Sequence, residues 1–424
     1  MTVAPCFQFQ NGILHAEDIP LTRLVKEYGT PLYVYSRAAL QDAWNAYAQA
    51  LEGHKALVCF GMKANSNLAV LSEFNRLGAG FDIVSGGELA RVLAAGGDPS
   101  KVVFSGVGKQ VWEMQAALEA GVKCFNVESE AELDRLSQVA STSGRVAPVS
   151  LRVNPDVDAQ THPYISTGLK ENKFGIAIET ALQVYRRAMA LPGLRIVGVD
   201  CHIGSQITEA APYLDALDKL IALIRELRSE GIELQHLDLG GGIGIRYVDE
   251  EVLKPATLLN QVFDRLQAAG LSHLELVLEP GRSLVGNAGV LVTEVQYLKH
   301  SEAKNFAIVD AAMNDLLRPT LYDAWHGVEP VQPRPVTSAT PVYDIVGPIC
   351  ESGDWLARDR TLELHQGDLL AIMSAGAYAF TMASQYNTRP RPAEIMVDGS
   401  RSHVVRQRET IESLFEGERL LPAD

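Results

Sequence analysis

The feature that most constrains the fold is a strand-and-helix rhythm that repeats between Ala56 and Gly281. Eight short apolar runs, rich in Val, Ile and Leu, each end in polar or glycine residues: "ALVCFGMKA", "GFDIVSGG", "KVVFSGV", "KCFNVES", "PVSLRVNP", "RIVGVDCHIG", "QHLDLGGG" and "ELVLEPG". Such runs are typical of parallel strands that are buried on both faces, and helical patterns separate them. Eight strand–helix units predict a closed (β/α)8 TIM barrel. A doubly wound open sheet is the alternative, and the count of eight favours closure.

After Gly281 the rhythm changes to strands with few helices between them. The runs are "GVLVTEVQYLKH", "NFAIVDA", "TPVYDIVGP" and "GDLLAIMSAGAYA". This pattern predicts a separate all-β domain of the sandwich or barrel kind, which the N-terminal runs "FQFQNGILH" and "PLYVYS" join. We therefore expect an α/β barrel domain over residues 36–283 and a β domain made of residues 1–35 and 284–424.

The composition limits the class of protein. The chain has 424 residues, of which 47% are hydrophobic and 21% charged, and its net charge is −15. The acidic excess argues against nucleic acid or an anionic membrane as a partner. We find no apolar run of the ~20 residues that span a bilayer and no signal-peptide pattern. The five cysteines are scattered without a CxxC pair, so we expect a cytoplasmic protein with no disulfide framework and no metal site.

Chemically useful residues gather where the predicted barrel strands end, which is where such barrels hold their functional groups. These residues are Lys63, Asp82, His202, Ser205, Gly241, Gly242, Glu279, Gly281 and Arg282. Glycine lets backbone N–H groups come close to an anion, and the loops after strands seven and eight form the usual phosphate site of such barrels. The same glycines would also suit an ordinary tight turn, so the spacing alone leaves both interpretations open.

Lys63 is unexpected because burying an ammonium group is costly, yet it follows an almost unbroken apolar run. An amine in a partly desolvated pocket can form a Schiff base with a carbonyl. A phosphate site, such a lysine and a carboxylate for a ring nitrogen together describe pyridoxal 5'-phosphate. The alternative is a surface lysine, with Glu279 paired to Arg282 and His202 in the core. The joint placement of these residues at strand ends favours the cofactor.

The motifs, in their order along the chain, resemble those of the diaminopimelate decarboxylases, which belong to the fold-type III, alanine racemase-like family of pyridoxal phosphate-dependent decarboxylases. They are "KAN", "FDIVSGGE", "HIGSQ", "LDLGGG", "EPGRS", "MNDLLRPTLY", "GPICESGD" and "GAY". The resemblance runs from "TPLYVYS" at Thr30 to "GAYAFTMASQYN" near the C-terminus. It implies that Lys63 forms the Schiff base with the cofactor, that His202 stacks on the cofactor ring and that Cys350 is the general acid.

The resemblance also assigns the remaining positions. It implies cofactor contacts from Lys63, Asp82, His202, Ser205, Gly241, Gly242, Glu279, Gly281, Arg282 and Tyr378, and substrate contacts from Arg282, Arg318, Tyr322, Glu351 and Tyr378. It implies a homodimer as well, in which Cys350 and Glu351 act in the barrel of the other subunit.

Charge complementarity narrows the expected reaction. A carboxylate at Glu279 stabilises a protonated pyridine nitrogen, which suits decarboxylation, whereas an arginine there would suit racemisation. Arg318 or Arg282 can clamp a distal carboxylate while Glu351 pairs with a distal ammonium. We therefore expect meso-2,6-diaminopimelate to be converted to L-lysine and CO2, the last step of the bacterial diaminopimelate route to lysine. The alternatives are a decarboxylase of ornithine, lysine or carboxynorspermidine, or a non-catalytic homologue, which would be expected to lose Lys63 or Cys350.

Overall fold

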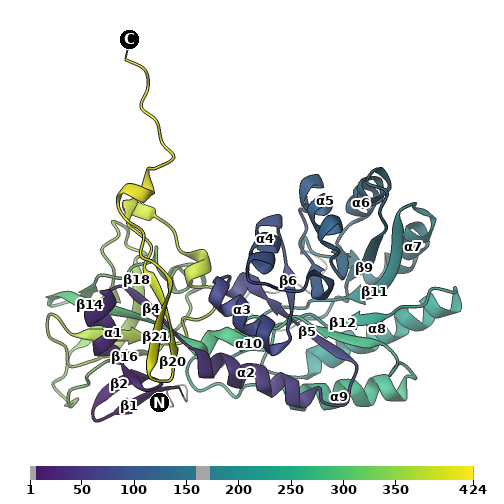
Figure 1. Cartoon of the computed structure of the whole chain (residues 1–424). Helices are drawn as coiled ribbons and strands as arrows, with labels where there is room; N and C mark the ends of the chain where they lie inside the picture. The colour runs from purple at the N-terminus through teal and green to yellow at the C-terminus, as the bar shows by residue number, and fades with distance from the viewer. Residues whose placement is uncertain (1–5, 159–171, 424) are drawn as a thin grey trace. The chain divides into compact units, whose positions relative to one another are not determined.

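The computed structural model describes residues 6–158 and 172–423, and the chain divides into two compact units (Figure 1). The barrel unit comprises Asp42–Ile245 and Glu250–Leu284, and the β unit comprises Met1–Gln41, Arg246–Asp249 and Val285–Asp424. Helices α2 (Arg37–Ala50) and α10 (Arg282–Val285) each lie across a boundary between the units. A search of the described residues finds no helix with the length and apolar character needed to cross a membrane.

The barrel unit is built on a closed parallel sheet, as the sequence predicts. Among the described residues, eight strands form the ring in the order β9-β11-β12-β13-β5-β6-β7-β8, and β8 pairs with β9 to close it. Their bounds are β5 (Ala56–Gly61), β6 (Gly80–Ile83), β7 (Val102–Phe104), β8 (Cys124–Val127), β9 (Ala147–Asn154), β11 (Leu194–Asp200), β12 (His236–Asp238) and β13 (Glu275–Leu278). A short additional strand, β10 (Ile176–Ala177), pairs with β9 outside the ring.

Buried residues from strands around the ring pack together. Cys59, Val103, Cys124, Val197 and Val277 form one cluster although they come from five different strands. Side chains from opposite sides of a closed sheet can meet only in its interior, so this cluster fills the inside of the barrel. The barrel is therefore a packed core, and room for a ligand exists only at its ends.

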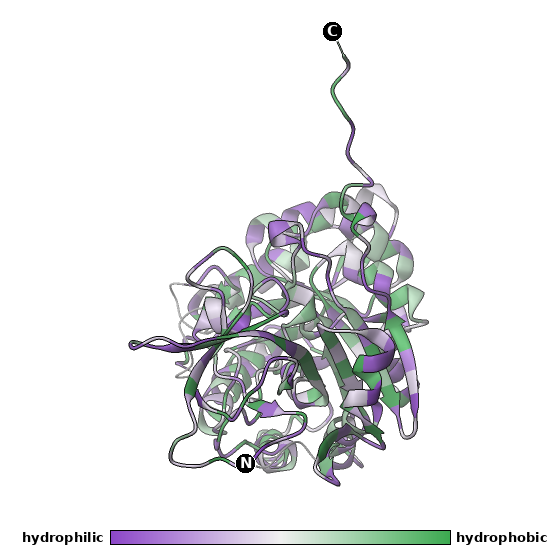
Figure 2. Cartoon of the chain, turned by 90° about the vertical axis from the view of Figure 1, so that its left-hand side faces the viewer, coloured by the Kyte–Doolittle hydropathy of each residue, from purple (hydrophilic) through white to green (hydrophobic). Residues whose placement is uncertain are grey.

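Helices follow the strands and cover the outside of the barrel (Figure 1). Their bounds are α3 (Leu68–Leu77), α4 (Gly86–Ala94), α5 (Val111–Ala120), α6 (Glu130–Thr142), α7 (Ile178–Ala190), α8 (Ala211–Ser229) and α9 (Pro255–Ala268). Several begin at a side-chain cap: Asn67, Ser85 and Ser129 each accept a backbone N–H of the first turn. The helices carry both hydrophilic and hydrophobic residues, as expected for helices with one face on a sheet (Figure 2).

The β unit contains a mixed sheet that joins the two ends of the chain. Its central order is β18-β17-β15-β14-β4-β20-β21, and β19 pairs with both β14 and β16. The N-terminal strand β4 (Leu32–Ser36) runs antiparallel to β14 and parallel to β20, which confirms that the N-terminal segment joins this domain. The other strands are β14 (Gly289–Lys299), β15 (Asn305–Val309), β16 (Val328–Pro330), β17 (Val342–Val346), β18 (Trp355–Thr361), β19 (Leu369–Ile372), β20 (Ala393–Asp398) and β21 (Arg401–Arg406).

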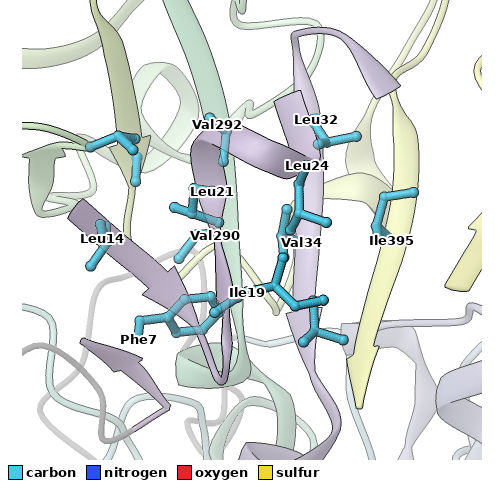
Figure 3. Close-up of a cluster of buried hydrophobic side chains, with 14 of the residues drawn as sticks. Phe7, Leu14, Ile19, Leu21, Leu24, Leu32, Val34, Val290, Val292 and Ile395 are labelled. Atoms are coloured by element: carbon cyan, nitrogen blue, oxygen red, sulfur yellow. The ribbon is translucent and has the colours of Figure 1, made fainter. Parts of the chain in front are cut away.

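A separate three-stranded sheet and a helix cover part of this larger sheet. They are β1 (Phe7–Gln10), β2 (Ile13–Ala16), β3 (Ile19–Pro20) and α1 (Leu21–Tyr28). Phe7, Leu14 and Leu21 are fully buried against Val290 and Ile395 in one apolar cluster (Figure 3). Truncating a leucine in such a core costs about 2–5 kcal/mol, so residues 7–34 contribute directly to the stability of this unit. A further short helix, α11 (Arg318–Tyr322), lies in the loop between β15 and β16.

Candidate active site

Lys63 lies at the C-terminal end of β5, in a short 3-10 turn over Met62–Ala64. Its Nζ is 2.5 Å from Oδ2 of Asp82, which is in β6. The side chain of Asp82 is fully buried, whereas that of Lys63 is 35% exposed. An ion pair of this kind offsets the cost of desolvating the amine, and about a third of the lysine side chain stays exposed. Lys63 is therefore placed as an accessible amine beside a buried acid.

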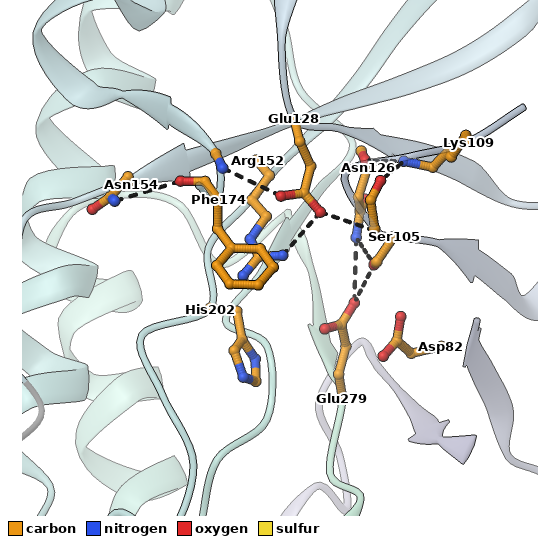
Figure 4. A network of polar contacts seen from close by, with 12 residues as sticks. Asp82, Ser105, Lys109, Asn126, Glu128, Arg152, Asn154, Phe174, His202 and Glu279 are labelled. Carbon is orange, nitrogen blue, oxygen red and sulfur yellow. Dashed lines mark hydrogen bonds and ion pairs between the residues drawn. The ribbon is translucent and has the colours of Figure 1, made fainter. Parts of the chain in front are cut away.

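Glu279 follows β13 and is buried among polar groups in or just after strands β7 and β8, which lie elsewhere in the ring (Figure 4). Its Oε1 accepts hydrogen bonds from Ser105 Oγ at 3.4 Å and from Asn126 Nδ2 at 3.3 Å. Asn126 Nδ2 also donates to Ser105 Oγ at 3.2 Å. These bonds fix the plane of the carboxyl group, so Glu279 presents an oriented acid to the inside of the barrel.

Two further acids lie next to Glu279. One carboxylate oxygen from each of Asp200, Asp238 and Glu279 lies within 4.8 Å of the others, and all three residues are buried. Burial, with added repulsion from Asp82, raises the pKa of Asp238 to about 7 although the N–H of Gly240 lowers it. Burial and repulsion from Asp238 raise the pKa values of Asp200 and Glu279 well above their ordinary values. Among the described residues, Oδ1 of Asp200 and Oδ2 of Asp238 have no hydrogen-bond partner. Three carboxylates this close cannot all be charged, so this acid cluster holds protons at neutral pH.

Arg152 supplies positive charge near the acid cluster. Its Nη1 lies 3.0 Å from Oε1 of Glu128, and its guanidinium lies 4.8 Å from the centre of the Phe174 ring (Figure 4). Glu128 also accepts backbone N–H bonds from Gly106 at 2.9 Å and from Gly175 at 3.2 Å. Arg152 lowers the pKa values of Asp200 and Asp238, although burial outweighs this effect in both. The cation is thus held by the ends of several strands and loops.

His202 follows β11 and is held as a neutral ring. The backbone N–H of Gly241 donates to its Nδ1 at 3.2 Å, so the neutral imidazole carries its proton on Nε2. Burial lowers the pKa of His202 well below its ordinary value, and the cations Arg152 and Lys63 lower it further. A neutral imidazole can lie against a positively charged aromatic ring without charge repulsion.

The loops after β11, β12 and β13 approach one another so closely that only glycine fits. A Cβ at Gly241 would lie 2.1 Å from the carbonyl oxygen of Glu279, and one at Gly242 would lie 2.3 Å from that of Gly204. Gly242 also has a φ of +107°, which favours glycine. These loops therefore form a backbone cradle with little side-chain cover.

Ser205 and Arg282 border this cradle, and Gly281 lies close to β5, the first strand of the barrel. Arg282 Nη2 donates to Ser205 Oγ at 3.1 Å, which brings a cation to the loop after β11. Gly281 lies beside the end of β5, since a Cβ at Gly61 would be 3.5 Å from its Cα. An accessible amine, an oriented acid, a neutral imidazole and a glycine cradle with an arginine fit an aldehyde cofactor that has a basic ring nitrogen and a phosphate.

The β unit contains the other predicted residues, beginning with Cys350 and Glu351 in the loop after β17. Both are exposed. The backbone N–H and the Sγ of Cys350 donate to Oδ1 of Asn387 at 3.2 and 3.3 Å. The hydroxyl of Tyr386 donates to Oε1 of Glu351. Buried Asp354 holds the loop itself, because its carboxylate accepts the backbone N–H of Ile349 at 2.7 Å.

Arg318 and Tyr322 are at the two ends of helix α11. Arg318 is only 7% exposed, so it is a buried arginine. Its guanidinium lies 4.7 Å from the centre of the Tyr247 ring, and Nη1 donates to Nε2 of His326 at 2.8 Å. Nδ1 of His326 donates to the carbonyl of Met373 at 2.8 Å, which leaves Nε2 as the acceptor. Arg318 is therefore held in one orientation.

Helix α11 is tied to the loop that carries Cys350. Thr320 Oγ1 donates to the carbonyl of Gly353 at 2.7 Å. Tyr322 and Tyr378 are both half-buried, and Tyr378 has a left-handed φ of +53° in the loop after β19. Within the β unit, the hydrogen bond from Thr320 to Gly353 therefore connects the helix of Arg318 with the loop of Cys350 and Glu351.

Comparison with known proteins identifies the family. Residues 37–286 match the family model described as "Pyridoxal-dependent decarboxylase, pyridoxal binding domain". Curated diaminopimelate decarboxylases of Pseudomonas aeruginosa and Vibrio cholerae are 60% and 58% identical over 416 and 417 residues, covering 98% of this chain and 99% of each relative. The chain belongs to the diaminopimelate decarboxylases. A crystal structure of "Diaminopimelate Decarboxylase from m. jannaschii in co-complex with L-lysine" has a TM-score of 0.93 at 35% identity, covering 99% of this chain and 98% of that one.

Another solved relative supports this membership in the diaminopimelate decarboxylases. The structure of the Helicobacter pylori diaminopimelate decarboxylase "complexed with L-lysine" has a TM-score of 0.89 at 42% identity, covering 93% of this chain and 98% of that one. The open-sheet alternative is therefore wrong, because both the closed ring of strands and these relatives require a barrel.

Several polar residues of the diaminopimelate decarboxylase barrel escaped the sequence reasoning. They are Ser105, Asn126, Glu128, Arg152 and Asp200, which lie in or just after strands. A signal was present, since a polar residue inside an apolar run, such as Arg152 in "PVSLRVNP", points to an inward-facing functional group. Tyr386 and Asn387 end the stretch "GAYAFTMASQYN" of the family resemblance, but the resemblance assigned them no role, and they lie in a short turn outside any periodic pattern.

Proposed function

We propose that this chain is a pyridoxal phosphate-dependent diaminopimelate decarboxylase that converts meso-2,6-diaminopimelate to L-lysine and CO2, the last step of the bacterial diaminopimelate route to lysine. The identity to curated diaminopimelate decarboxylases, which extends over nearly the full length of the chain, supports the reaction. The assignment of the cofactor depends on one observation, the Lys63–Asp82 pair. This pair lies with Glu279 and the glycine cradle at the strand ends of one barrel.

The barrel residues are proposed to hold the cofactor. When bound, pyridoxal phosphate takes up the electron pair that the leaving carboxylate deposits on the α-carbon. Lys63 Nζ holds the cofactor through its aldehyde carbon, and Asp82 keeps the amine in place. Glu279 stabilises a proton on the ring nitrogen, because an opposite charge favours the charged form. The neutral imidazole of His202 covers one face of the ring and excludes water from it.

The phosphate of the cofactor is proposed to lie at the glycine cradle. Gly241, Gly242 and Gly281 let backbone N–H groups approach its oxygens, since no Cβ stands in the way. Ser205 and Arg282, which are already hydrogen-bonded to each other, add a hydroxyl and a positive charge. Tyr378 is assigned to the phosphate and to the substrate.

The β unit is proposed to supply the substrate contacts and the proton donor. A fixed guanidinium at Arg318, together with Arg282, can clamp the distal carboxylate of diaminopimelate in bidentate fashion. Tyr322 adds a hydroxyl, and Glu351 pairs with the distal ammonium. Cys350 donates a proton to the α-carbon after CO2 leaves. A substrate without a distal carboxylate, such as ornithine, would leave a buried arginine without its anion, which is costly.

This division of labour defines the proposed domains and assembly. The barrel domain of residues 36–283 binds the cofactor, and the β domain of residues 1–35 and 284–424 contributes substrate-binding and catalytic residues. We propose a homodimer in which Cys350 and Glu351 act in the barrel of the other subunit. We also propose that the protein is cytoplasmic, because its relatives are named for the decarboxylation of a small amino acid and its five scattered cysteines form no pattern typical of a disulfide framework.

The reaction is tested by measuring products from meso-diaminopimelate, ornithine and lysine side by side. We expect L-lysine and CO2 from diaminopimelate and no comparable turnover of the other two. A clear preference for ornithine would overturn the substrate assignment.

The cofactor assignment is tested by Lys63→Ala, which should remove the absorbance band of the covalently held cofactor. The matched control is Lys123→Ala, because Lys123 also pairs with an acid, Glu275 at 2.6 Å, but next to the N-terminal ends of β8 and β13. The control variant should keep the band. A Lys63→Ala protein with the unchanged band would show that another amine holds the cofactor.

A further inference from the structure

The side chain of Asn387 contacts Cys350 through two hydrogen bonds to a single atom. Its Oδ1 accepts the backbone N–H of Cys350 at 3.2 Å and the thiol of the same residue at 3.3 Å. We propose that Asn387 is a positioning residue that orients the thiol of Cys350 for proton donation. The proposal deepens the proposed function, because it rests on Cys350 being the proton donor.

The assignment of the oxygen atom follows from the donor it faces. A backbone N–H can only donate, so the amide atom opposite the nitrogen of Cys350 must be the carbonyl oxygen and not the NH2 group. The same oxygen then meets the sulfur, where it can accept the S–H but offers nothing to a thiolate. The contact therefore fixes the direction in which the S–H of Cys350 points, which a proton donor needs.

The backbone at Asn387 shows that this position is specified. Asn387 has φ +54° and ψ +27°, and the next residue, Thr388, also has a left-handed φ, of +55°. Asparagine adopts this conformation more readily than other residues with a side chain. The N–H of Thr388 closes the turn on the carbonyl of Gln385 at 2.8 Å. The turn is anchored on both sides, since Ser384 N–H donates to the carbonyl of Asn314 at 2.9 Å and Arg389 Nη2 donates to the carbonyl of Asp310 at 2.6 Å. An anchored turn can hold an exposed side chain at a fixed place.

The contact matters because Cys350 is exposed and lies in a loop. A solvent-facing cysteine would otherwise exchange between side-chain rotamers, and only some of these would aim the proton at the substrate. The neighbouring residue acts in parallel, because Tyr386 donates its hydroxyl to Glu351. Two consecutive residues of the turn thus hold two consecutive residues of the loop, and each can be removed without the other.

The test measures the alkylation of Cys350 by iodoacetamide as a function of pH in the full-length protein. Cys59, Cys124 and Cys201 are buried and Cys6 is half-buried, so a Cys6→Ser background makes the reaction report on Cys350. A Cys350→Ser variant in that background gives the residual rate to subtract. This readout does not need turnover.

We expect opposite shifts from two substitutions of Asn387. Asn387→Gly keeps the left-handed backbone but removes the acceptor of the S–H, so the pH–rate profile should move to lower pH. Asn387→Asp places a carboxylate there, which repels the thiolate, so the profile should move to higher pH. Thr388→Gly, which loosens the backbone beside Asn387, and Tyr386→Phe, which removes only the contact to Glu351, should leave the profile in place. If the pH–rate profile is unchanged in both Asn387 variants, Asn387 does not contact the thiol of Cys350 in solution, and the proposal is wrong.

Steady-state kinetics separate positioning from mere contact. In Asn387→Gly we expect kcat to fall about tenfold with little change in KM, since the proton donor is misaligned but the substrate contacts remain. A shifted alkylation profile with an unchanged kcat would overturn the positioning role. A wild-type protein that shows no turnover of diaminopimelate would refute the proposed function instead, while the alkylation profiles would still decide the contact.

Discussion

The acid cluster in the barrel and the Cys350–Glu351 loop in the β unit achieve reactivity in different ways. Asp200, Asp238 and Glu279 are buried, and their pKa values are raised by burial and by nearby carboxylates. Cys350 and Glu351 are exposed and are held by hydrogen bonds to a distant turn, two at Cys350 and one at Glu351. Burial therefore tunes proton affinity in the barrel, whereas hydrogen-bond geometry orients groups in the β unit.

This difference has consequences for stability. A buried acid that must lose its proton works against folding, because desolvation disfavours the charged form. An exposed residue with one hydrogen-bond partner contributes little to the free energy of unfolding. Substitutions in the acid cluster should therefore change stability and its pH dependence, and substitutions in the Cys350–Glu351 loop should change kinetics alone.

Cys350→Ala should have the largest effect on activity. Removal of a general acid typically lowers kcat about 10²–10⁴-fold. Thermal unfolding should be almost unchanged, because the exposed side chain loses only its contact to Asn387. Steady-state kinetics and thermal melts measure both effects, with Cys6→Ala as the control for loss of a thiol. Full activity in Cys350→Ala would mean that the proton comes from another group, and a large drop in melting temperature would remove the contrast with the barrel.

Asp238→Asn should change the pH dependence of stability in the cofactor-free protein. Burial raises the pKa of Asp238 from 3.8 to about 7. Its contribution to stability is therefore full below pH 4 and is lost as the pH rises through 7, because the buried carboxyl must then ionise. Since the amide of the variant does not ionise, the free energy of unfolding should fall less as the pH rises from 4 to 7. The difference from the wild type should be on the order of 1–4 kcal/mol. The Oδ1 contact to the N–H of Gly240, now 2.8 Å, can be kept.

Denaturant unfolding at a series of pH values between 4 and 8 measures this slope. Asp98→Asn is the matched control, because the carboxyl of Asp98 is exposed and accepts a backbone N–H two residues on, from Ser100, just as that of Asp238 does from Gly240. The control variant should keep the wild-type slope in this range. An Asp238→Asn protein with the wild-type slope would show that the proton of the cluster resides elsewhere.

The barrel was predictable from the sequence because its order is periodic. Each apolar run became a strand, and strands that pair in parallel register bring their ends together, so Lys63, Asp82 and Glu279 could be placed at one end of the barrel. Arg152 and Asp200 were harder, since alternation does not say which polar residue inside a run faces inward. Their role depends on packing across the closed ring, which is a tertiary property.

The turn at Asn387 lay beyond sequence reasoning for a physical reason. It is 37 residues away from Cys350, and nothing in its composition marks it as a partner. Two left-handed residues in a row arise from the surrounding anchors rather than from local preference, since threonine does not favour that conformation. Exposed sites built from turns are thus specified by tertiary contacts, whereas buried sites at strand ends are specified by the strands themselves.

Glu409→Gln should show the smallest effect, with a sign opposite to that of Asp238→Asn. Partial burial raises the pKa of Glu409, but hydrogen bonds from the side chain and backbone of Arg391 and from Gln385 outweigh it and lower the pKa from 4.5 to about 2. Its contribution is therefore present above pH 4.5 and lost as the pH falls through 2. The free energy of unfolding of the variant should be lower than that of the wild type by on the order of 1 kcal/mol at pH 6, and by less at pH 3. Unfolding measured at both pH values, with exposed Glu416→Gln as the control, tests this; an equal loss at both would show that the ion pair with Arg391 has no electrostatic role in stability.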